Sequence, residues 1–314
     1  MQKTAHPALA RDGTRLHFTE IGEGAPAVIL SDGIGCAGFV WRHLEPALAA
    51  HHRIIHWNYR GHGRSARPRD AYRVTLDDCV EDLLCVLDAA GERRAVLAGH
   101  SMGVQVSLEA HRRAPERVAG LLLVCGAPGH PLDTFHDSSA LRLAFPFAKN
   151  AVEKHPTLAR LLFQAVVPTD FAIELALAHE VNGARVERAD LVRYFGDLAD
   201  IDPLLFVRML ASANETDSSD HLAKVDVPTL IVAGGRDSFT PVRLSEAMHR
   251  AIAGSELAVI AHGTHVTPLE YPALVARHIR SFLRRRLGPP RRIPAARPPR
   301  SARRRRTGTD EDPR

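Results

Sequence analysis

A chain of 314 residues that is 45% hydrophobic and 25% charged can bury a large core, and this composition is ordinary for a soluble globular protein. No uninterrupted apolar run approaches the roughly 20 residues of a membrane-spanning helix, so we expect no membrane span. The net charge of +5 arises from one segment. Residues 284–314 hold 12 of the 41 Lys+Arg and 3 of the 36 Asp+Glu, so residues 1–283 carry a net charge of −4.

The basic segment is a predicted C-terminal tail, residues 285–314, that is rich in Arg and Pro. Because it has almost no large apolar side chains, it cannot bury enough surface to offset its conformational entropy, and we expect it to be disordered. The run Arg303–Arg306 can bind phosphate groups non-specifically. No aromatic residues interleave this run, so we expect no specific nucleic-acid partner.

Cysteine usage and the N-terminus predict a cytoplasmic location. Cys36, Cys79, Cys85 and Cys125 form no C-x-x-C pair, which indicates free thiols in a reducing compartment. The first residues contain no apolar segment typical of a secretory signal. No cluster of His, Asp, Glu or Cys has a defensible metal-ligand spacing, so we expect neither a metal nor a cofactor. The sequence gives no indication of the oligomeric state.

The first 129 residues alternate between predicted strands and helices, which favours a mostly parallel sheet with helices on its faces, an α/β fold. Short apolar runs without alternation are typical of strands buried on both faces. The predicted strands lie at 17–21, 27–30, 53–57, 95–98 and 118–124, and the predicted helices at 40–50, 76–91 and 102–113.

The alternation stops near residue 129 and resumes after residue 224. Between them, helical patterns predict an inserted helical cap, residues 130–224, which would cover the ligand crevice at the carboxyl edge of the sheet. Residues 1–129 and 225–284 would form the core. The predicted cap helices are 139–152, 157–167, 170–181, 190–198 and 203–213, followed in the core by strands at 229–233 and 256–260 and helices at 242–253 and 271–284.

The pentapeptide Gly99-His100-Ser101-Met102-Gly103 follows a predicted strand and precedes a predicted helix. This is the context of a G-x-S-x-G nucleophile elbow, in which glycines permit a sharp turn that exposes the serine hydroxyl. Alone, the pattern also arises by chance. Two further chemical groups follow later strands: Asp237 follows the strand at 229–233, and His265 follows the last strand.

The carboxyl ends of parallel strands share one edge, so Ser101, Asp237 and His265 can meet there. A serine hydroxyl needs a neighbouring base to become a nucleophile, histidine suits that role, and a carboxylate fixes the histidine tautomer. The residues themselves leave alternatives. Asp133 or Asp202 could supply the carboxylate, and His262 could be the base.

Residues 10–284 resemble the α/β-hydrolase fold superfamily, in its branch with a helical cap. The resemblance rests on the elbow, on Gly235-Arg236-Asp237, on Gly263-Thr264-His265 and on Arg60-Gly61-His62-Gly63-Arg64-Ser65. It implies Ser101 as nucleophile, Asp237 as acid and His265 as base, with an oxyanion hole made by the backbone N–H groups of Ile34 and Met102. It implies no cofactor. His100 is interpreted as a packing residue of the elbow.

Two positions depart from the family pattern. Asp32-Gly33 stands where many members have His-Gly, and Asn58 stands where Asp is frequent. A carboxylate beside an oxyanion would repel it, so we expect Asp32 to point away or to be paired.

These residues predict a serine hydrolase that acts on a small or medium-sized carboxylic ester through an acyl-enzyme intermediate. Serine in the elbow argues against the dehalogenase and epoxide hydrolase chemistry of relatives with Asp at that position. The same three side chains can also serve a C–C bond hydrolase, an acyltransferase or a cofactor-free perhydrolase. A small-ligand receptor is the alternative without catalysis.

Overall fold

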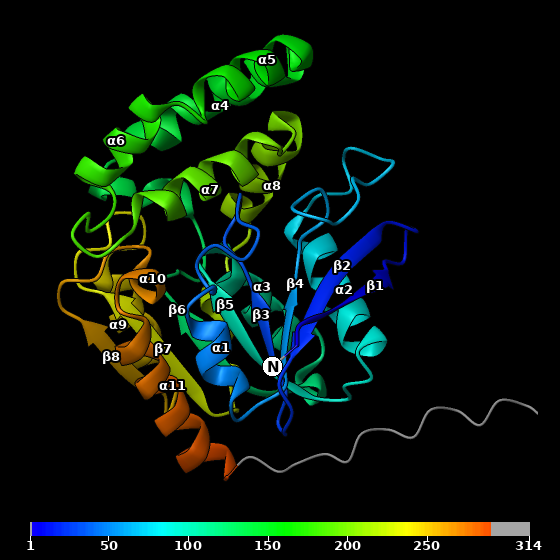
Figure 1. Cartoon of the computed structure of the whole chain (residues 1–314), viewed down its shortest axis with the longest axis vertical. Coiled ribbons are helices and arrows are strands. Elements are labelled where there is room, and N and C mark those ends of the chain that lie inside the picture. The colour runs from blue at the N-terminus through cyan, green and yellow to red at the C-terminus, as the bar shows by residue number, and fades with distance from the viewer. Residues whose placement is uncertain (1, 290–314) are drawn as a thin grey trace, which may run out of the picture.

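The computed structural model describes residues 2–289, and its centre is an eight-stranded sheet (Figure 1). The strand order is β1-β2-β4-β3-β5-β6-β7-β8, and every pair from β4 to β8 is parallel. The α/β fold predicted from the sequence is therefore confirmed. The strands are β1 (Thr4–Leu9), β2 (Arg15–Ile21), β3 (Val28–Ser31), β4 (Ile54–Trp57), β5 (Ala95–His100), β6 (Val118–Val124), β7 (Thr229–Gly234) and β8 (Glu256–Ile260).

The edge strand β1 was not predicted from the sequence. Its segment contains Pro7 and is mostly exposed, so it shows neither an apolar run nor a clear alternation. It pairs antiparallel with β2, which in turn pairs antiparallel with β4. An edge strand of this kind forms because its partner strand supplies the hydrogen bonds. This pairing is a tertiary interaction, so the local sequence pattern does not reveal it.

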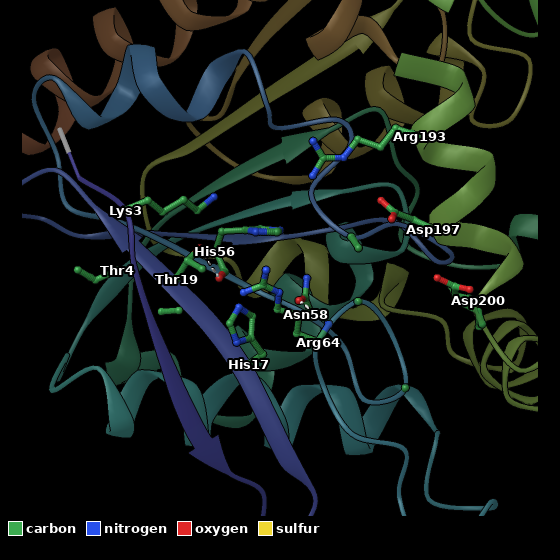
Figure 2. A pocket seen from close by; sticks show the side chains of 15 residues that line it. Lys3, Thr4, His17, Thr19, His56, Asn58, Arg64, Arg193, Asp197 and Asp200 are labelled. Carbon is green, nitrogen blue, oxygen red and sulfur yellow. Dashed lines mark hydrogen bonds between the residues drawn. The ribbon is translucent and has the colours of Figure 1, made fainter. Parts of the chain in front are cut away.

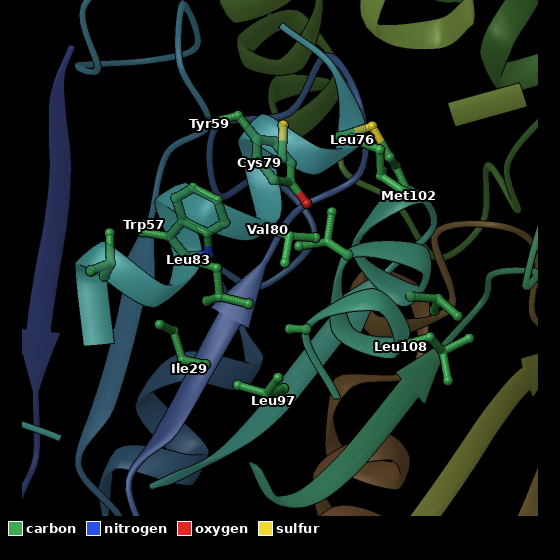
Figure 3. Close-up of a cluster of buried hydrophobic side chains, with 14 of the residues drawn as sticks. Ile29, Trp57, Tyr59, Leu76, Cys79, Val80, Leu83, Leu97, Met102 and Leu108 are labelled. Carbon is green, nitrogen blue, oxygen red and sulfur yellow. The ribbon is translucent and has the colours of Figure 1, made fainter. Parts of the chain in front are cut away.

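Helices cover both faces of the sheet because alternate strand residues point to opposite sides. On one face, α1 (Leu44–Ala49) and α11 (Pro272–Leu287) pack over residues such as Leu30 and Val232. On the other face, α2 (Leu76–Ala89), α3 (Met102–Arg113) and α9 (Val242–Ala251) enclose residues such as Ile29 and Leu97. Figure 3 shows this second cluster between the sheet and the helices. Together the two clusters fix the sheet edge from which the polar loops emerge.

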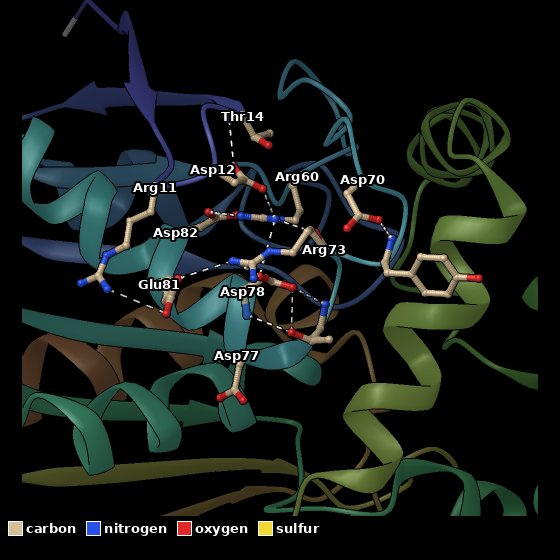
Figure 4. Close-up of polar contacts among 12 residues, drawn as sticks. Arg11, Asp12, Thr14, Arg60, Asp70, Arg73, Asp77, Asp78, Glu81 and Asp82 are labelled. Carbon is tan, nitrogen blue, oxygen red and sulfur yellow. Dashed lines mark hydrogen bonds and ion pairs between the residues drawn. The ribbon is translucent and has the colours of Figure 1, made fainter.

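A buried ionic network anchors the loop after β4. The Arg60 guanidinium donates to both carboxylate oxygens of Asp82 on α2, at 2.7 and 2.6 Å, and to Asp12 at 3.0 Å (Figure 4). Burial alone would lower the pKa of Arg60, but the hydrogen bonds and the charge of Asp82 raise it above its ordinary value. Thr75 and Asp78 form a capping box that starts α2 in the same region.

Five α-helices lie between β6 and β7, the segment for which the sequence predicts a cap. In Figure 1, α7 and α8 lie over the carboxyl edge of the sheet, and α4, α5 and α6 form an outer layer farther from it. The division of the chain into core and cap domains stays a prediction. The helices are α4 (Ala140–Lys154), α5 (Pro156–Val166), α6 (Asp170–His179), α7 (Arg188–Ala199) and α8 (Pro203–Glu215).

The last helix is longer than predicted, so the predicted start of the tail at residue 285 is wrong. α11 continues through Leu287, three residues beyond the predicted end at residue 284. Leu287 packs against the core, and Arg285 pairs with Glu256 on β8, so the final turn has both apolar and ionic partners. The rest of the predicted tail, residues 290–314, lies outside the described residues, as does Arg303–Arg306.

Between residues 2 and 289, no single helix is long and apolar enough to cross a membrane. The helices α5 and α6, bent by 71° at the break between them, pass that test of length and composition as a pair.

Candidate active site

Ser101 occupies the sharp turn that joins β5 to α3. Its backbone has φ 54° and ψ −117°, a strained conformation for a residue with a side chain. The flanking glycines are required by space: a Cβ on Gly99 would overlap the backbone of Gly103, and a Cβ on Gly103 would lie 2.5 Å from the Ser31 carbonyl oxygen. The turn lifts the Ser101 side chain above the carboxyl edge of the sheet.

Three side chains from three strand ends meet at this turn. The Nε2 atom of His265 lies 3.0 Å from Ser101 Oγ, and its Nδ1 atom lies 3.1 and 3.0 Å from the two carboxylate oxygens of Asp237. Ser101 follows β5, Asp237 follows β7 and His265 follows β8. The structure thus brings together the serine, acid and histidine that the resemblance implies.

The alternative acids have other partners. Asp133 pairs with Arg142 at 3.0 Å, and Asp202 caps α8 by accepting from the Leu204 N–H at 3.0 Å. Among the described residues, His262 makes no contact with Ser101 of the kind that His265 makes. Within residues 2–289, the carboxylate in contact with His265 Nδ1 is Asp237, and the histidine in contact with Ser101 Oγ is His265.

The Asp237 carboxylate is held by donors from its own loop. Its Oδ1 accepts from the N–H groups of Phe239 and Thr240 at 2.9 and 2.8 Å, and its Oδ2 accepts from the Thr240 hydroxyl at 2.8 Å. Burial alone would raise the pKa of Asp237, but the charge of His265 and hydrogen bonds from His265 and Thr240 hold it below its ordinary value. The carboxylate is thereby fixed in its charged form.

Two residues beside Asp237, neither of them predicted from the sequence, orient the histidine. The Phe239 ring stacks on the His265 imidazole at a centroid distance of 4.8 Å, and the Thr240 hydroxyl lies 3.5 Å from His265 Nδ1. The spacing Asp-x-x-Thr is one signal that could have revealed Thr240, since an Asp side chain readily accepts from N–H groups two and three residues later.

His100 contacts the backbone of His265. It is buried, and its Nε2 lies 2.9 Å from the His265 carbonyl oxygen. Burial, and then the neighbouring His265, lower the pKa of His100 to about 4, so the ring is neutral near pH 7. A neutral ring that contacts the backbone of His265 agrees with the packing role predicted for it.

Two free backbone N–H groups lie near Ser101. Met102 is the first residue of α3, where N–H groups have no partner within the helix, and Ile34 lies in the loop after β3. Neither N–H donates to a protein acceptor within residues 2–289. Ile34, Ser101 and Met102 line one small cavity together. The predicted pair of oxyanion donors is thus free and adjacent to the serine.

Asp32, where the chain departs from the family pattern, is paired. Its Oδ2 atom lies 2.8 Å from His56 Nε2 and accepts from the Gly38 N–H at 2.9 Å, while its backbone carbonyl accepts from the Tyr59 hydroxyl at 2.8 Å. The side chain therefore holds the loop that carries Ile34. Asp32 is paired, which is one of the two arrangements expected from the sequence. The other departure, Asn58, accepts from the Arg64 N–H and shapes the following loop.

Two cavities of unequal size flank Ser101 and share Ile34. One has a volume of about 40 Å³ and the other of about 270 Å³. Glu180, the acidic residue that lines the larger cavity, accepts from Ser238 and contacts His136, each at 2.9 Å. The small cavity includes Met102, Ala127, Leu210 and Ala213, and the large one is lined mainly by Phe39, Val181, Leu191, Tyr194, Phe195, Leu198, Phe206 and Phe239.

A polar cleft of about 520 Å³ lies apart from these cavities, between the N-terminal strands and α7. Figure 2 shows His17, His56, Asn58 and Arg64 on its strand side, and Arg193, Asp197 and Asp200 on its helix side. None of the three residues that meet at the elbow lines this cleft.

In the described part of the chain, no group of three or more His, Cys, Asp or Glu is placed to hold a metal ion.

Comparisons with known proteins show which family the chain resembles. A family model described as alpha/beta hydrolase fold matches residues 26–272. A protein of Azorhizobium caulinodans, whose name assigns it provisionally as carbamate hydrolase RutD, is 30% identical over 260 residues, covering 81% of this chain and 90% of that protein. Another relative, the dihydrolipoyllysine-residue acetyltransferase component of the acetoin cleaving system of Pseudomonas putida, is 31% identical over 276 residues, with coverage of 87% and 68%.

Solved structures of a hydrolase and an esterase are similar to this chain. A hydrolase from Pseudomonas aeruginosa PA01 is 26% identical with a TM-score of 0.73, covering 89% of this chain and 98% of that one. A thermophilic esterase from Thermogutta terrifontis is 25% identical with a TM-score of 0.70, covering 91% and 99%.

Proposed function

Because the chain belongs to the alpha/beta hydrolase fold family, we propose that it is a serine hydrolase that cleaves carboxylic esters through an acyl-enzyme intermediate. The observation that carries the proposal is the continuous contact from Ser101 Oγ through the His265 ring to Asp237, with distances of 3.0 to 3.1 Å. In this role Ser101 is the nucleophile, His265 the general base and Asp237 the carboxylate that orients it.

In the first half-reaction, Ser101 Oγ attacks the ester carbonyl carbon while His265 Nε2 takes the hydroxyl proton. Asp237 stabilises the imidazolium that results. The tetrahedral oxyanion accepts hydrogen bonds from the N–H groups of Ile34 and Met102, each typically worth about 3 kcal/mol in such a site. The C–O bond to the leaving alcohol then breaks, and His265 gives its proton to the alcohol oxygen.

In the second half-reaction, water replaces the alcohol. His265 takes a proton from the water, whose oxygen attacks the acyl carbon and forms a second oxyanion in the same hole. Collapse of this intermediate breaks the bond to Ser101 Oγ, and the serine regains its proton from His265. The products are one carboxylic acid and one alcohol, and no cofactor takes part in any step.

The unequal cavities support a substrate with one small and one bulky apolar substituent around its ester group. A cavity of about 40 Å³ accepts a group of one or two carbon atoms, whereas about 270 Å³ accepts an aromatic or branched aliphatic group. The aromatic lining of the larger cavity favours an apolar group without charge.

Carbamates are a second candidate class, favoured by the relative from Azorhizobium caulinodans whose name contains that activity. A carbamate presents the same carbonyl to Ser101, so the residues and steps above apply without change. Cleavage of its C–O bond releases the same kind of alcohol, and the acyl product is a carbamic acid, which breaks down to an amine and carbon dioxide.

The test is hydrolysis of p-nitrophenyl esters of increasing acyl length, and of a p-nitrophenyl carbamate, by wild type, Ser101→Ala and Ser219→Ala. Ser219 is exposed at the start of the short 3-10 helix η4 (Ser219–Lys224), which makes it a matched control. We expect ester hydrolysis by wild type and by Ser219→Ala and its loss in Ser101→Ala. Preference for the carbamate would favour the second class. Equal activity in all three proteins, or none on any substrate, would overturn the proposal.

A further inference from the structure

The outer layer of helices exposes an unusual amount of apolar surface. Neither α4 nor α5 contains a buried residue. Phe147 is 78% exposed and Phe171 is 77% exposed, values that core-type side chains rarely reach in a folded protein. The outer apolar face comprises Leu143, Phe147, Leu158, Leu161, Leu162, Val166 and Phe171.

The pattern on α5 shows that this exposure is systematic. Leu158, Leu161, Leu162 and Val166 fall at i, i+3, i+4 and i+8, which places them on one helix face. In a globular protein such a stripe normally packs against the core. Here all four are more than half exposed, while Phe163 points inward toward Phe206 on α8, with ring centroids 6.4 Å apart. An exposed apolar stripe of this kind marks an interaction site.

The charges around the patch distinguish the kind of partner. Helices α4 and α5 carry four cationic residues and one acidic residue, although residues 1–283 have a net charge of −4. Lys154 and Arg160 form neither an ion pair nor a side-chain hydrogen bond with any described residue. Their charges are therefore free to meet an anionic surface. The five charged residues are Arg142, Lys149, Glu153, Lys154 and Arg160.

From these observations we propose that the outer apolar face binds an anionic lipid surface. An amphipathic helix with Leu and Phe on one side and Lys or Arg beside them inserts its apolar face at the boundary between headgroups and acyl chains. Figure 1 shows α4 and α5 at the outer edge of the molecule, where a flat surface can approach without meeting the core. A second copy is less suitable, because a self-complementary contact between these helices offers only Glu153 as an acidic partner for four cationic residues.

The test is co-sedimentation of the full-length protein with phosphatidylcholine vesicles, with and without phosphatidylglycerol. The variant F147Q/L161Q removes two exposed apolar groups, and Leu9→Gln is the matched control because Leu9 is 64% exposed on the distant strand β1. We expect wild type and Leu9→Gln to bind the anionic vesicles, and F147Q/L161Q to bind roughly tenfold or more weakly. K154Q/R160Q should lose the preference for anionic over neutral vesicles.

Two outcomes overturn the proposal. Equal binding by wild type and F147Q/L161Q would show that other groups, such as the Arg-rich segment at the C-terminus, attract the lipid. Absence of binding, combined with a wild-type dimer that F147Q/L161Q converts to a monomer in sedimentation velocity, would assign the face to a second copy. Neither Phe147 nor Leu161 lines the cavities beside Ser101, so circular dichroism and ester hydrolysis serve as controls for folding.

Discussion

The hydroxyl of Thr240 donates a 2.8 Å hydrogen bond to Asp237 Oδ2, the same oxygen that lies 3.0 Å from His265 Nδ1. One side chain thus fixes the rotation of the carboxylate that orients the base. The Thr240 side chain also lines the small cavity, but its hydroxyl acts on the reaction through Asp237 and His265, which makes Thr240 a positioning residue.

Thr240→Val keeps the shape of the side chain and removes the donor. We expect kcat for ester hydrolysis to fall about tenfold with KM nearly unchanged, since the bond serves the transition state rather than substrate binding. Thr240→Ser, which keeps the hydroxyl, should restore most of kcat. Steady-state kinetics of the three proteins check this, and an equal loss in the valine and serine variants would contradict it.

Leu210 limits the small cavity beside Ser101. Leu210→Ala removes three carbon atoms from its wall, and one extra methylene of substrate is typically worth about 1–3 kcal/mol in such a pocket. We therefore compare two esters that differ in the size of the substituent held by the small cavity. The kcat/KM for the ester with the larger substituent should rise roughly tenfold relative to that for the ester with the smaller one. Leu204→Ala, on the same helix but away from both cavities, is the control. An unchanged ratio would mean that this cavity does not hold the substrate.

The positions of Ser101, Asp237 and His265 could be predicted because parallel strands deliver their carboxyl ends to one edge. Ser101 directly follows β5, and Asp237 and His265 lie in the loops that follow β7 and β8. Thr240, Phe239 and His56 could not be predicted in the same way. Their roles depend on side-chain directions within loops, such as the turn that returns Thr240 to Asp237, or the approach of β4 that brings His56 to Asp32. The end of α11 was misplaced because Leu287 gains its partners from the core rather than from its neighbours in sequence.

His100 makes the stability of the protein depend on pH. Its pKa of about 4 in the folded protein lies below the value near 6.5 of an unfolded chain, so only the unfolded state gains a proton as the pH falls between these values. Stability is therefore lost as the pH decreases through this window. Between pH 7.5 and pH 5, this one group should lower the free energy of unfolding by about 2 kcal/mol.

Urea unfolding of wild type and His100→Gln at both pH values measures that contribution, because every other titrating group is common to the two proteins. Glutamine keeps a donor for the His265 carbonyl. The variant should lose less stability than wild type on acidification. Parallel pH dependence in the two proteins would contradict the prediction.

The ion pair of Arg60 and Asp82 is buried on both sides, with each side chain 2% exposed or less. Arg60→Met removes one partner and leaves the Asp82 charge uncompensated, which typically costs about 3–5 kcal/mol. Chemical denaturation should show this loss. Arg113→Met breaks an ion pair with the exposed Asp77 and should cost less than about 1 kcal/mol. Similar losses in the two variants would refute the assigned difference in burial energy.

The central claim is that Ser101 is the nucleophile, and titration with a fluorophosphonate probe tests it most directly. Such a probe forms a stable bond with an activated serine oxygen. We predict that ester hydrolysis falls in proportion to the bound probe, reaches zero at one probe per chain, and that mass spectrometry finds the probe on Ser101. Hydrolysis that persists after Ser101 is fully labelled, or labelling of Ser101→Ala to the same extent as wild type, would contradict the account.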